Sequence, residues 1–266
     1  MNAQDPQPRQ RKGIYLLPNL FTTGTLFGGF LAIVSAMNGN FGVAAMAILG
    51  ATIADALDGR IARMTNTQTD FGKEYDSLCD MVAFGVATSV VMYAFSLHHL
   101  AEYRWLGGKL GWVVAFTFTA CTALRLARFN VMMENRDRPP WQGAYFTGVP
   151  APAGAFLVLL PVYLGFLGIE PDSYYASIVS CYTLLVAFLL VSNLPVWSGK
   201  TLGARIPRAQ VIPLILGVVF YVAMLATYTW LTLTLSVLAY LAFLPYSLRM
   251  WRKQAARHAR EAEQSQ

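Results

Sequence analysis

Long apolar runs alternate with short polar segments along the whole chain. Eight of these runs approach the length of about 20 apolar residues that a helix needs to cross the hydrocarbon core of a bilayer. They cover residues 19–37, 41–63, 77–99, 109–132, 147–168, 173–194, 210–228 and 230–248. Because lipid offers no hydrogen-bond partner to an open strand edge, the pattern predicts an all-α, polytopic transmembrane helix bundle of about eight spans.

The composition agrees with a lipid environment. Hydrophobic residues make up 56% of the chain and charged residues only 13%, whereas soluble domains average roughly 45–50% and about 25%. The net charge of +6 does not indicate nucleic-acid binding, because the basic residues are spread over short loops without interleaved aromatic residues. We therefore expect the lipid bilayer, and no nucleic acid, as a partner.

The basic residues are distributed unequally between the two sides of the predicted bundle. With the N-terminus in the cytoplasm, 18 of the 20 lysines and arginines fall on the cytoplasmic side, and only Arg104 and Lys109 fall outside. The positive-inside rule then predicts that both termini are cytoplasmic and that the number of spans is even. The chain divides into a disordered cytoplasmic tail (1–12), a transmembrane domain (13–248) and a cytoplasmic basic tail (249–266).

Four aspartates lie at the predicted cytoplasmic ends of the second and third spans. Asp55 and Asp58 are three residues apart, and Asp76 and Asp80 are four residues apart. Each pair therefore shares one face of its helix. The loop between the two spans is short, so we expect the two pairs to meet at the cytoplasmic edge of the membrane.

Four carboxylates so close to lipid require compensating cations, since charged groups are costly there. Hard oxygen ligands suit Mg²⁺ or Mn²⁺, and two such ions could clamp a phosphoryl group during its transfer. Gly59 and Gly72 leave room for a phosphate to approach the backbone, and Arg63 can offer it paired hydrogen bonds. The pattern thus indicates metal-dependent phosphoryl transfer.

Two other interpretations of the aspartates stay open. The carboxylates could form a purely structural network with Arg60, Arg63 and Lys73, although charge pairing alone does not need this spacing of glycine and aspartate. An ion-coupled transporter could also use an acidic site. Transporters often contain internal repeats, however, and the later half of the chain has no second set of aspartates.

The spacing of these residues resembles the signature of the CDP-alcohol phosphotransferases, D-x2-D-G-x2-A-R-x8-G-x3-D-x3-D. All eight fixed positions match, within 26 residues: Asp55, Asp58, Gly59, Ala62, Arg63, Gly72, Asp76 and Asp80. The resemblance implies that a hydroxyl attacks the β-phosphorus of a CDP-linked donor and that CMP leaves. It also implies that the four aspartates hold two divalent ions and that Asp80 takes the proton from the hydroxyl.

The resemblance further implies which residues contact the donor. These are the glycines, arginine and threonine around the signature and a segment at the start of the first span: Gly59, Arg63, Thr69, Gly72, Pro18, Asn19, Leu20 and Phe21.

Three further segments, 125–130, 146–152 and 191–193, together with Lys200, resemble the branch of this family that uses CDP-diacylglycerol as donor and L-serine as acceptor. Val149 stands where we would expect leucine, which is a mild departure. The products implied are phosphatidylserine and CMP. The same reaction with glycerol 3-phosphate, inositol or choline as acceptor stays open.

The candidate acceptor contacts follow the fourth predicted span. Arg125 and Arg128 are three residues apart, and one of them could hold the serine carboxylate through two parallel hydrogen bonds. Both could instead anchor the helix end at the membrane surface. Asn130 and Lys200 are further candidates. The resemblance also implies a homodimer, and we expect a multi-pass protein of a bacterial inner (plasma) membrane with its active site facing the cytoplasm.

Overall fold

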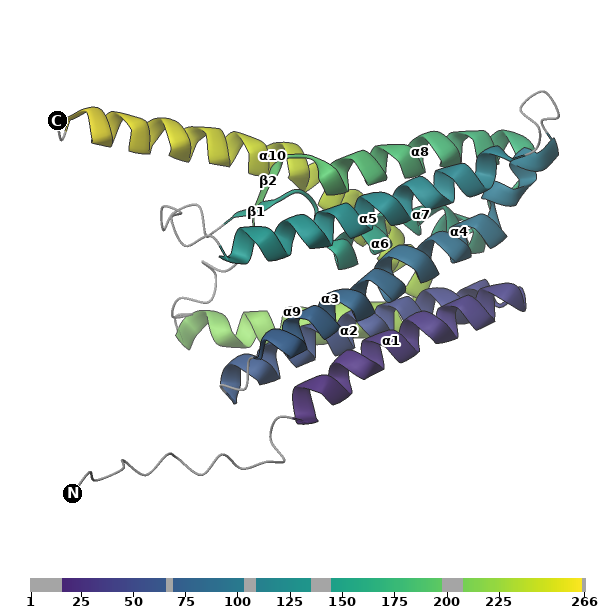
Figure 1. The fold of residues 1–266 in the computed structure, drawn as a ribbon, viewed down its shortest axis with the longest axis horizontal. Helices are drawn as coiled ribbons and strands as arrows, with labels where there is room; N and C mark the ends of the chain where they lie inside the picture. The colour runs from purple at the N-terminus through teal and green to yellow at the C-terminus, as the bar shows by residue number, and fades with distance from the viewer. Residues whose placement is uncertain (1–15, 66–68, 103–108, 135–144, 198–207, 265–266) are drawn as a thin grey trace, which may run out of the picture.

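The computed structural model describes residues 16–65, 69–102, 109–134, 145–197 and 208–264 (Figure 1). They form the helices α1 (Leu16–Met37), α2 (Phe41–Met64), α3 (Asp70–Asp80), α4 (Thr88–Phe95), α5 (Leu110–Glu134), α6 (Ala151–Val158), α7 (Leu160–Phe166), α8 (Ser173–Val191), α9 (Arg208–Thr227) and α10 (Thr229–Gln264). A π-helical segment, η1 (Met81–Ala87), joins α3 to α4, and a 3-10 helix, η2 (Leu97–Glu102), follows α4. The predicted helical bundle is confirmed.

Among the described residues, seven helical stretches are long and apolar enough to cross a membrane, which makes the chain a multi-pass membrane protein: 19–37, 41–64, 70–95, 110–132, 173–191, 210–227 and 229–257. The eighth predicted run, 147–168, instead forms the two shorter helices α6 and α7.

The interruption between α6 and α7 has a local cause. Pro161, in the first turn of α7, has no backbone N–H to continue the helical hydrogen bonds. Its missing partner, the carbonyl of Leu157, accepts a hydrogen bond of 2.7 Å from the hydroxyl of Tyr182 in α8. The break is therefore stabilised by the neighbouring helix.

Helix α1 packs closely between α2 and the α3–η1 segment. A Cβ atom built on Gly28 would lie 2.9 Å from the carbonyl oxygen of Ala47 in α2, and one on Gly29 would lie 2.7 Å from Cα of Ala83 in η1. Small residues allow such close backbone contact between membrane helices. The three elements that surround the aspartates are thus held together by contacts that larger side chains would prevent.

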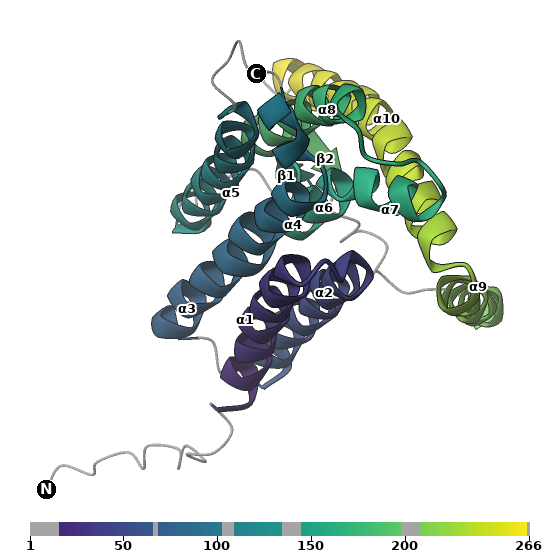
Figure 2. The same cartoon turned by 90° about the vertical axis from the view of Figure 1, so that its right-hand side faces the viewer.

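The remaining helices form the other side of the bundle. Helix α5 packs on α8, and α10 packs on α7. Helix α9 lies apart from the other helices and packs mainly against α10 (Figure 2). None of the residues 210–227 is buried. The start of α1 and the end of α10 lie at the same end of the bundle (Figure 1).

The two predicted tails differ in what the structure describes. Residues 1–12 lie outside the described residues. The predicted basic tail, 249–266, continues α10 as a helix as far as Gln264.

A small antiparallel sheet of β1 (Tyr145–Thr147) and β2 (Pro195–Trp197) is the only sheet among the described residues, with Tyr145 opposite Trp197. It connects the segment before α6 with the segment after α8. Gly148 follows β1 with a φ of +79°, and a Cβ atom there would lie 2.6 Å from the carbonyl oxygen of Leu190. Only glycine fits this turn.

Candidate functional site

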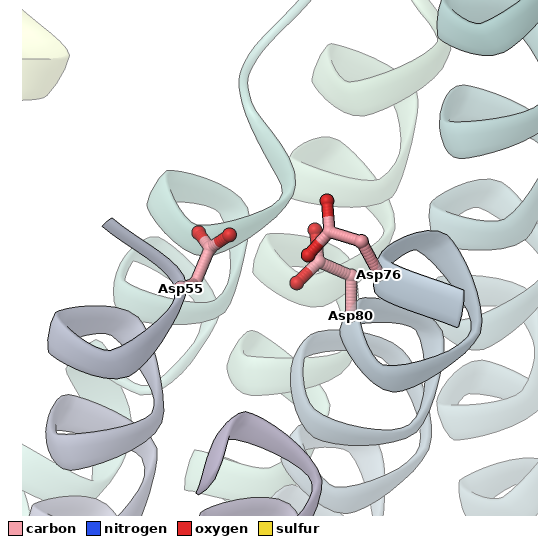
Figure 3. A group of neighbouring side chains, drawn as sticks. All are labelled: Asp55, Asp76 and Asp80. Atoms are coloured by element: carbon pink, nitrogen blue, oxygen red, sulfur yellow. The ribbon is translucent and has the colours of Figure 1, made fainter. Parts of the chain in front are cut away.

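Three of the predicted aspartates converge from two helices. Asp55 of α2 points toward Asp76 and Asp80 of α3 (Figure 3). One carboxylate oxygen from each residue lies within 4.8 Å of the other two. The predicted meeting of the two helix ends is therefore correct for these three side chains.

The three carboxylates have the properties of a cation site. Asp80 is 8% exposed, and neither Oδ1 of Asp76 nor Oδ1 of Asp80 has a hydrogen-bond partner although both atoms are buried. Buried acceptors without a donor are rare in proteins and call for another partner. Several carboxylate oxygens around one point are a suitable ligand set for Mg²⁺ or Mn²⁺, so the residues present fit the predicted metal.

The fourth aspartate, Asp58, lies beside this group and is tied to α1. It is 4% exposed, its Oδ2 accepts a hydrogen bond of 2.7 Å from the hydroxyl of Thr22, and its carboxyl group interacts with that of Asp76. Thr22 directly follows the segment 18–21 predicted from the sequence. No helical spacing rule links it to Asp58, because the contact crosses between helices.

Helix α1 also contacts α3. The hydroxyl groups of Thr23 and Tyr75 lie 3.0 Å apart and share a hydrogen bond. Tyr75 precedes Asp76, so this contact supports the first turns of α3 next to the carboxylates. Sequence analysis did not identify either residue, and a single sequence contains no signal for such a pair.

The start of α3 explains two of the predicted donor contacts. Thr69 caps the helix, with its side-chain hydroxyl accepting a hydrogen bond of 3.0 Å from the backbone N–H of Gly72. Such a cap satisfies a backbone donor that the helix itself leaves unpaired. A Cβ atom on Gly72 would lie 3.0 Å from that same hydroxyl and 3.8 Å from Oδ1 of Asn19. Thr69, Gly72 and Asn19 therefore lie together.

The other predicted donor contacts lie in the last two turns of α2 and at the start of α1. A Cβ atom on Gly59 would meet nothing within 4 Å. The exposed Arg63 donates a hydrogen bond of 2.8 Å from Nε to the carbonyl of Gly59, which orients its guanidinium group. Leu20 is exposed, and Pro18 lies in α1 with Phe21. The open space at Gly59 and the exposed Arg63 leave the end of α2 accessible.

The helix that carries Asp80 changes its geometry directly after this residue. Helix α3 ends at Asp80, and the π-helical η1 begins at Met81. Short π-helical segments occur frequently at functional sites, because they alter the direction of nearby side chains. The sequence contains no signal from which this change could be predicted.

The two predicted acceptor arginines on α5 have different surroundings. Arg125 is 9% exposed, it interacts electrostatically with Asp80 and Asp55, and its Nε has no hydrogen-bond partner. Its guanidinium group lies 5.4 Å from the ring centre of Phe129. Arg125 therefore interacts with the carboxylates and has an N–H group, at Nε, that is not hydrogen-bonded.

Arg128 is bound to the end of α8 instead. One terminal nitrogen donates a hydrogen bond of 3.1 Å to the carbonyl of Val191, and the other donates to the side-chain oxygen of Asn193. Segment 191–193, singled out from the sequence, is thus joined to α5.

Asn130, a further acceptor candidate, is bound to α3. The side-chain amide of Asn130 donates a hydrogen bond of 3.0 Å to the hydroxyl of Ser77, the residue that follows Asp76 in α3. Lys200 lies outside the described residues.

Comparison with known proteins identifies the family. A model of the CDP-alcohol phosphatidyltransferase family matches residues 15–192. A second model, CDP-alcohol phosphatidyltransferase 2, matches residues 210–245. Because the first match covers more than half of the chain, this protein belongs to the CDP-alcohol phosphatidyltransferase family, as the aspartate signature predicted.

Three relatives indicate the part of the family to which the chain is similar. A CDP-diacylglycerol–serine O-phosphatidyltransferase of Helicobacter pylori is 38% identical over 68% of this chain and 71% of its own length. The Mycobacterium bovis protein of the same name is 32% identical over 92% and 83%, respectively. An archaetidylserine synthase of Methanothermobacter thermautotrophicus is 29% identical over 67% and 68%. Each of these names includes serine, as acceptor or as part of the product.

Proposed function

We propose that this protein transfers the phosphatidyl group of CDP-diacylglycerol to the hydroxyl of L-serine and releases phosphatidylserine and CMP. The observation that carries this proposal is the group of Asp55, Asp76 and Asp80, with two buried carboxylate oxygens that lack a partner. It lies within the family signature, and relatives with 32–38% identity are named for this reaction.

Asp55, Asp58, Asp76 and Asp80 would hold two divalent ions, Mg²⁺ or Mn²⁺. Such ions, when bound, stabilise the negative charge that develops on the phosphoryl oxygens during transfer. The four carboxylates supply the oxygen ligands, and Thr22 holds Asp58 in place through its hydrogen bond. Groups that position metal ligands in this way commonly affect metal affinity.

The reaction breaks a phosphoanhydride bond of the donor and forms a phosphate ester with the acceptor. The serine Oγ forms a bond to the β-phosphorus while the bond from that phosphorus to the CMP oxygen breaks. Asp80 takes the proton that the serine hydroxyl loses. Its buried position next to Asp76 suits a base that acts on a substrate held away from bulk water.

The CDP head of the donor would bind at the accessible end of α2. Gly59 leaves open space there, and Arg63, Thr69, Gly72 and the segment 18–21 surround it. The two acyl chains of the donor would remain in the lipid, beside exposed apolar side chains such as Leu20, Leu57 and Met64. The donor would thus reach the aspartates without leaving the membrane.

The acceptor would bind on the opposite side, at α5. Arg125 supports this assignment better than Arg128, because Arg125 has an unpaired donor while both terminal nitrogens of Arg128 are bound to the end of α8. Asn130 is paired with Ser77 and is better suited to hold α3 in place. A contact between Lys200 and the acceptor stays a prediction.

The orientation and the assembly are also proposals. The positive-inside distribution supports an active site that faces the cytoplasm of a bacterial inner membrane. A homodimer is supported by α9, whose residues 210–227 have no buried member in the single chain. Crosslinking of a cysteine introduced into α9 of the membrane-embedded protein would report a second copy beside it.

One assay tests the proposed reaction. Purified protein in lipid receives CDP-diacylglycerol with labelled L-serine, glycerol 3-phosphate, inositol or choline in turn, and CMP release is measured with and without Mg²⁺ or Mn²⁺. We expect CMP release with serine only, and none after chelation. Release with another acceptor would assign that acceptor, and full activity under strong chelation would refute the metal site.

A further inference from the structure

Two buried hydrogen-bond donors near the aspartates have no partner. Among the described residues, only a few buried side-chain atoms lack one, and outside the carboxylates they include Nε of Arg125 and the hydroxyl of Tyr240. Leaving a buried donor unpaired is costly, so native proteins rarely do so without a functional reason. Tyr240 lies in α10, the last helix of the chain, and is not part of the family signature.

These two donors are linked by an electrostatic interaction, and Arg125 also interacts with the aspartates. Arg125 interacts electrostatically with Asp80 and Asp55 on one helix pair and with Tyr240 on α10. Arg125 is therefore within electrostatic reach of both the carboxylates and the tyrosine, although the α2–α3 pair, α5 and α10 are far apart in the sequence.

With the two divalent ions proposed above, the charge of this region would favour an anion next to Arg125. Four carboxylates and two divalent ions have opposite and equal charge. The guanidinium of Arg125 would then remain as a buried cation, and no salt bridge to it occurs among the described residues. An isolated buried charge is strongly unfavourable. The missing partner is an anion that accepts hydrogen bonds from both Arg125 and Tyr240.

We propose that Arg125 and Tyr240 together form the subsite that binds the carboxylate of the acceptor, with the Tyr240 hydroxyl as the second donor. This inference rests on the proposed function, because it takes L-serine as the acceptor. In serine the carboxylate and the hydroxyl are carried by adjacent carbon atoms. A carboxylate bound at Arg125 thus leaves the hydroxyl near Asp80, the group proposed to take its proton.

A contact with the donor phosphates is less suitable for these two residues. The proposed donor positions, Gly59 and Arg63, border open space at the end of α2, whereas Arg125 is 9% exposed. A small acceptor can reach a buried arginine more easily than a lipid-linked nucleotide can. The subsite would therefore discriminate between acceptors by their carboxylate.

The test compares Tyr240→Phe with a matched control, Tyr246→Phe, in the same helix. Tyr246 is 55% exposed. The KM and kcat are measured for L-serine and for CDP-diacylglycerol, together with the rate for ethanolamine at high concentration, an acceptor that lacks the carboxylate. Loss of a hydrogen bond to a charged group corresponds to a drop of about ten- to a hundredfold in kcat/KM.

We expect Tyr240→Phe to lower kcat/KM for serine by this factor, mainly through KM, and to leave the ethanolamine rate and the donor KM unchanged. Tyr246→Phe should behave like the wild type. An equal loss with both acceptors, an unchanged serine KM, or a higher donor KM would overturn the subsite. If Tyr240→Phe fails to fold, Arg125→Lys decides by the same criteria, because it keeps the charge but loses the paired hydrogen bonds.

The outcomes separate this inference from the proposed function. A wild-type protein that releases no CMP with serine refutes the proposed function itself. If the wild type uses serine and Tyr240→Phe prefers serine over ethanolamine to the same degree, only the role of Tyr240 is refuted.

Discussion

The two sides of the candidate site are built in different ways. The acidic side comes from α2 and α3, within residues 55–80, and its side chains are arranged by helical spacing and one short loop. The opposite side combines Arg125 of α5, the segment after α8 and Tyr240 of α10. A metal site can thus be encoded locally, whereas the side proposed to select the acceptor depends on how distant helices pack.

The two arginines on α5 illustrate the same difference within a single helix. Arg125 and Arg128 are equivalent in type and separated by less than one turn. Arg125 is buried and keeps an unpaired nitrogen, while Arg128 is bound to Val191 and Asn193. The small angular difference between the two positions therefore separates a group that is available to a ligand from one that joins two helices.

The largest effect is expected on the acidic side. Asp80→Asn keeps the shape of the side chain but removes the proposed base, so turnover should fall by about 10²- to 10⁴-fold. Binding of CDP-diacylglycerol, measured in lipid by titration, should remain detectable. Asp70→Asn is the control, because Asp70 lies in the same helix and only pairs with the exposed Lys73. Normal turnover of Asp80→Asn would refute its role as base.

The next effect sharpens the comparison between the two arginines. Arg125→Gln should lower kcat/KM for serine by about a hundredfold, because a charged partner of the carboxylate is lost. Arg128→Gln should mainly lower the melting temperature, since it removes hydrogen bonds between α5 and the end of α8. Steady-state kinetics measures the change in kcat/KM, and thermal unfolding measures the change in melting temperature. If Arg128→Gln raised the serine KM more than Arg125→Gln, the acceptor would belong to Arg128 instead.

A smaller effect is expected where α1 supports the acidic side. Thr22→Val removes the hydrogen bond to Asp58 and should raise the divalent-ion concentration for half-maximal activity by about tenfold. Thr25→Val is the matched control, because Thr25 is buried in the same helix and its hydroxyl contacts only backbone carbonyls of Phe21 and Ala51 in the described contacts. Equal activation curves for the two variants would contradict a positioning role of Thr22.

The smallest effect concerns the link between the two sides. Ser77 of α3 and Asn130 of α5 share a hydrogen bond of 3.0 Å. A double-mutant cycle with Ser77→Ala and Asn130→Ala should give a coupling free energy of about 0.5–1.5 kcal/mol. It is measured from the unfolding of each variant in the same detergent. Additive effects would mean that the two residues do not hold α3 against α5.

The spans and the aspartates could be predicted because each depends on a local pattern. A run of apolar residues is sufficient to identify a helix in lipid, and spacings of three and four residues put two carboxylates on one face. The run 147–168 shows where a local pattern fails. Its length predicts one span, but Pro161 divides it, and the hydroxyl of Tyr182 satisfies the carbonyl that the break exposes.

The sequence by itself determined the membrane-embedded helices, the family signature and the four aspartates that the signature contains. Only the tertiary structure decided that Thr22 holds Asp58, that Arg128 binds the end of α8, and that Nε of Arg125 and the hydroxyl of Tyr240 lack a hydrogen-bond partner. The physical reason is the range of the interactions. Hydrophobic runs and helical faces depend on neighbours within one or two turns, whereas these hydrogen bonds join helices whose relative position depends on the packing of the whole bundle.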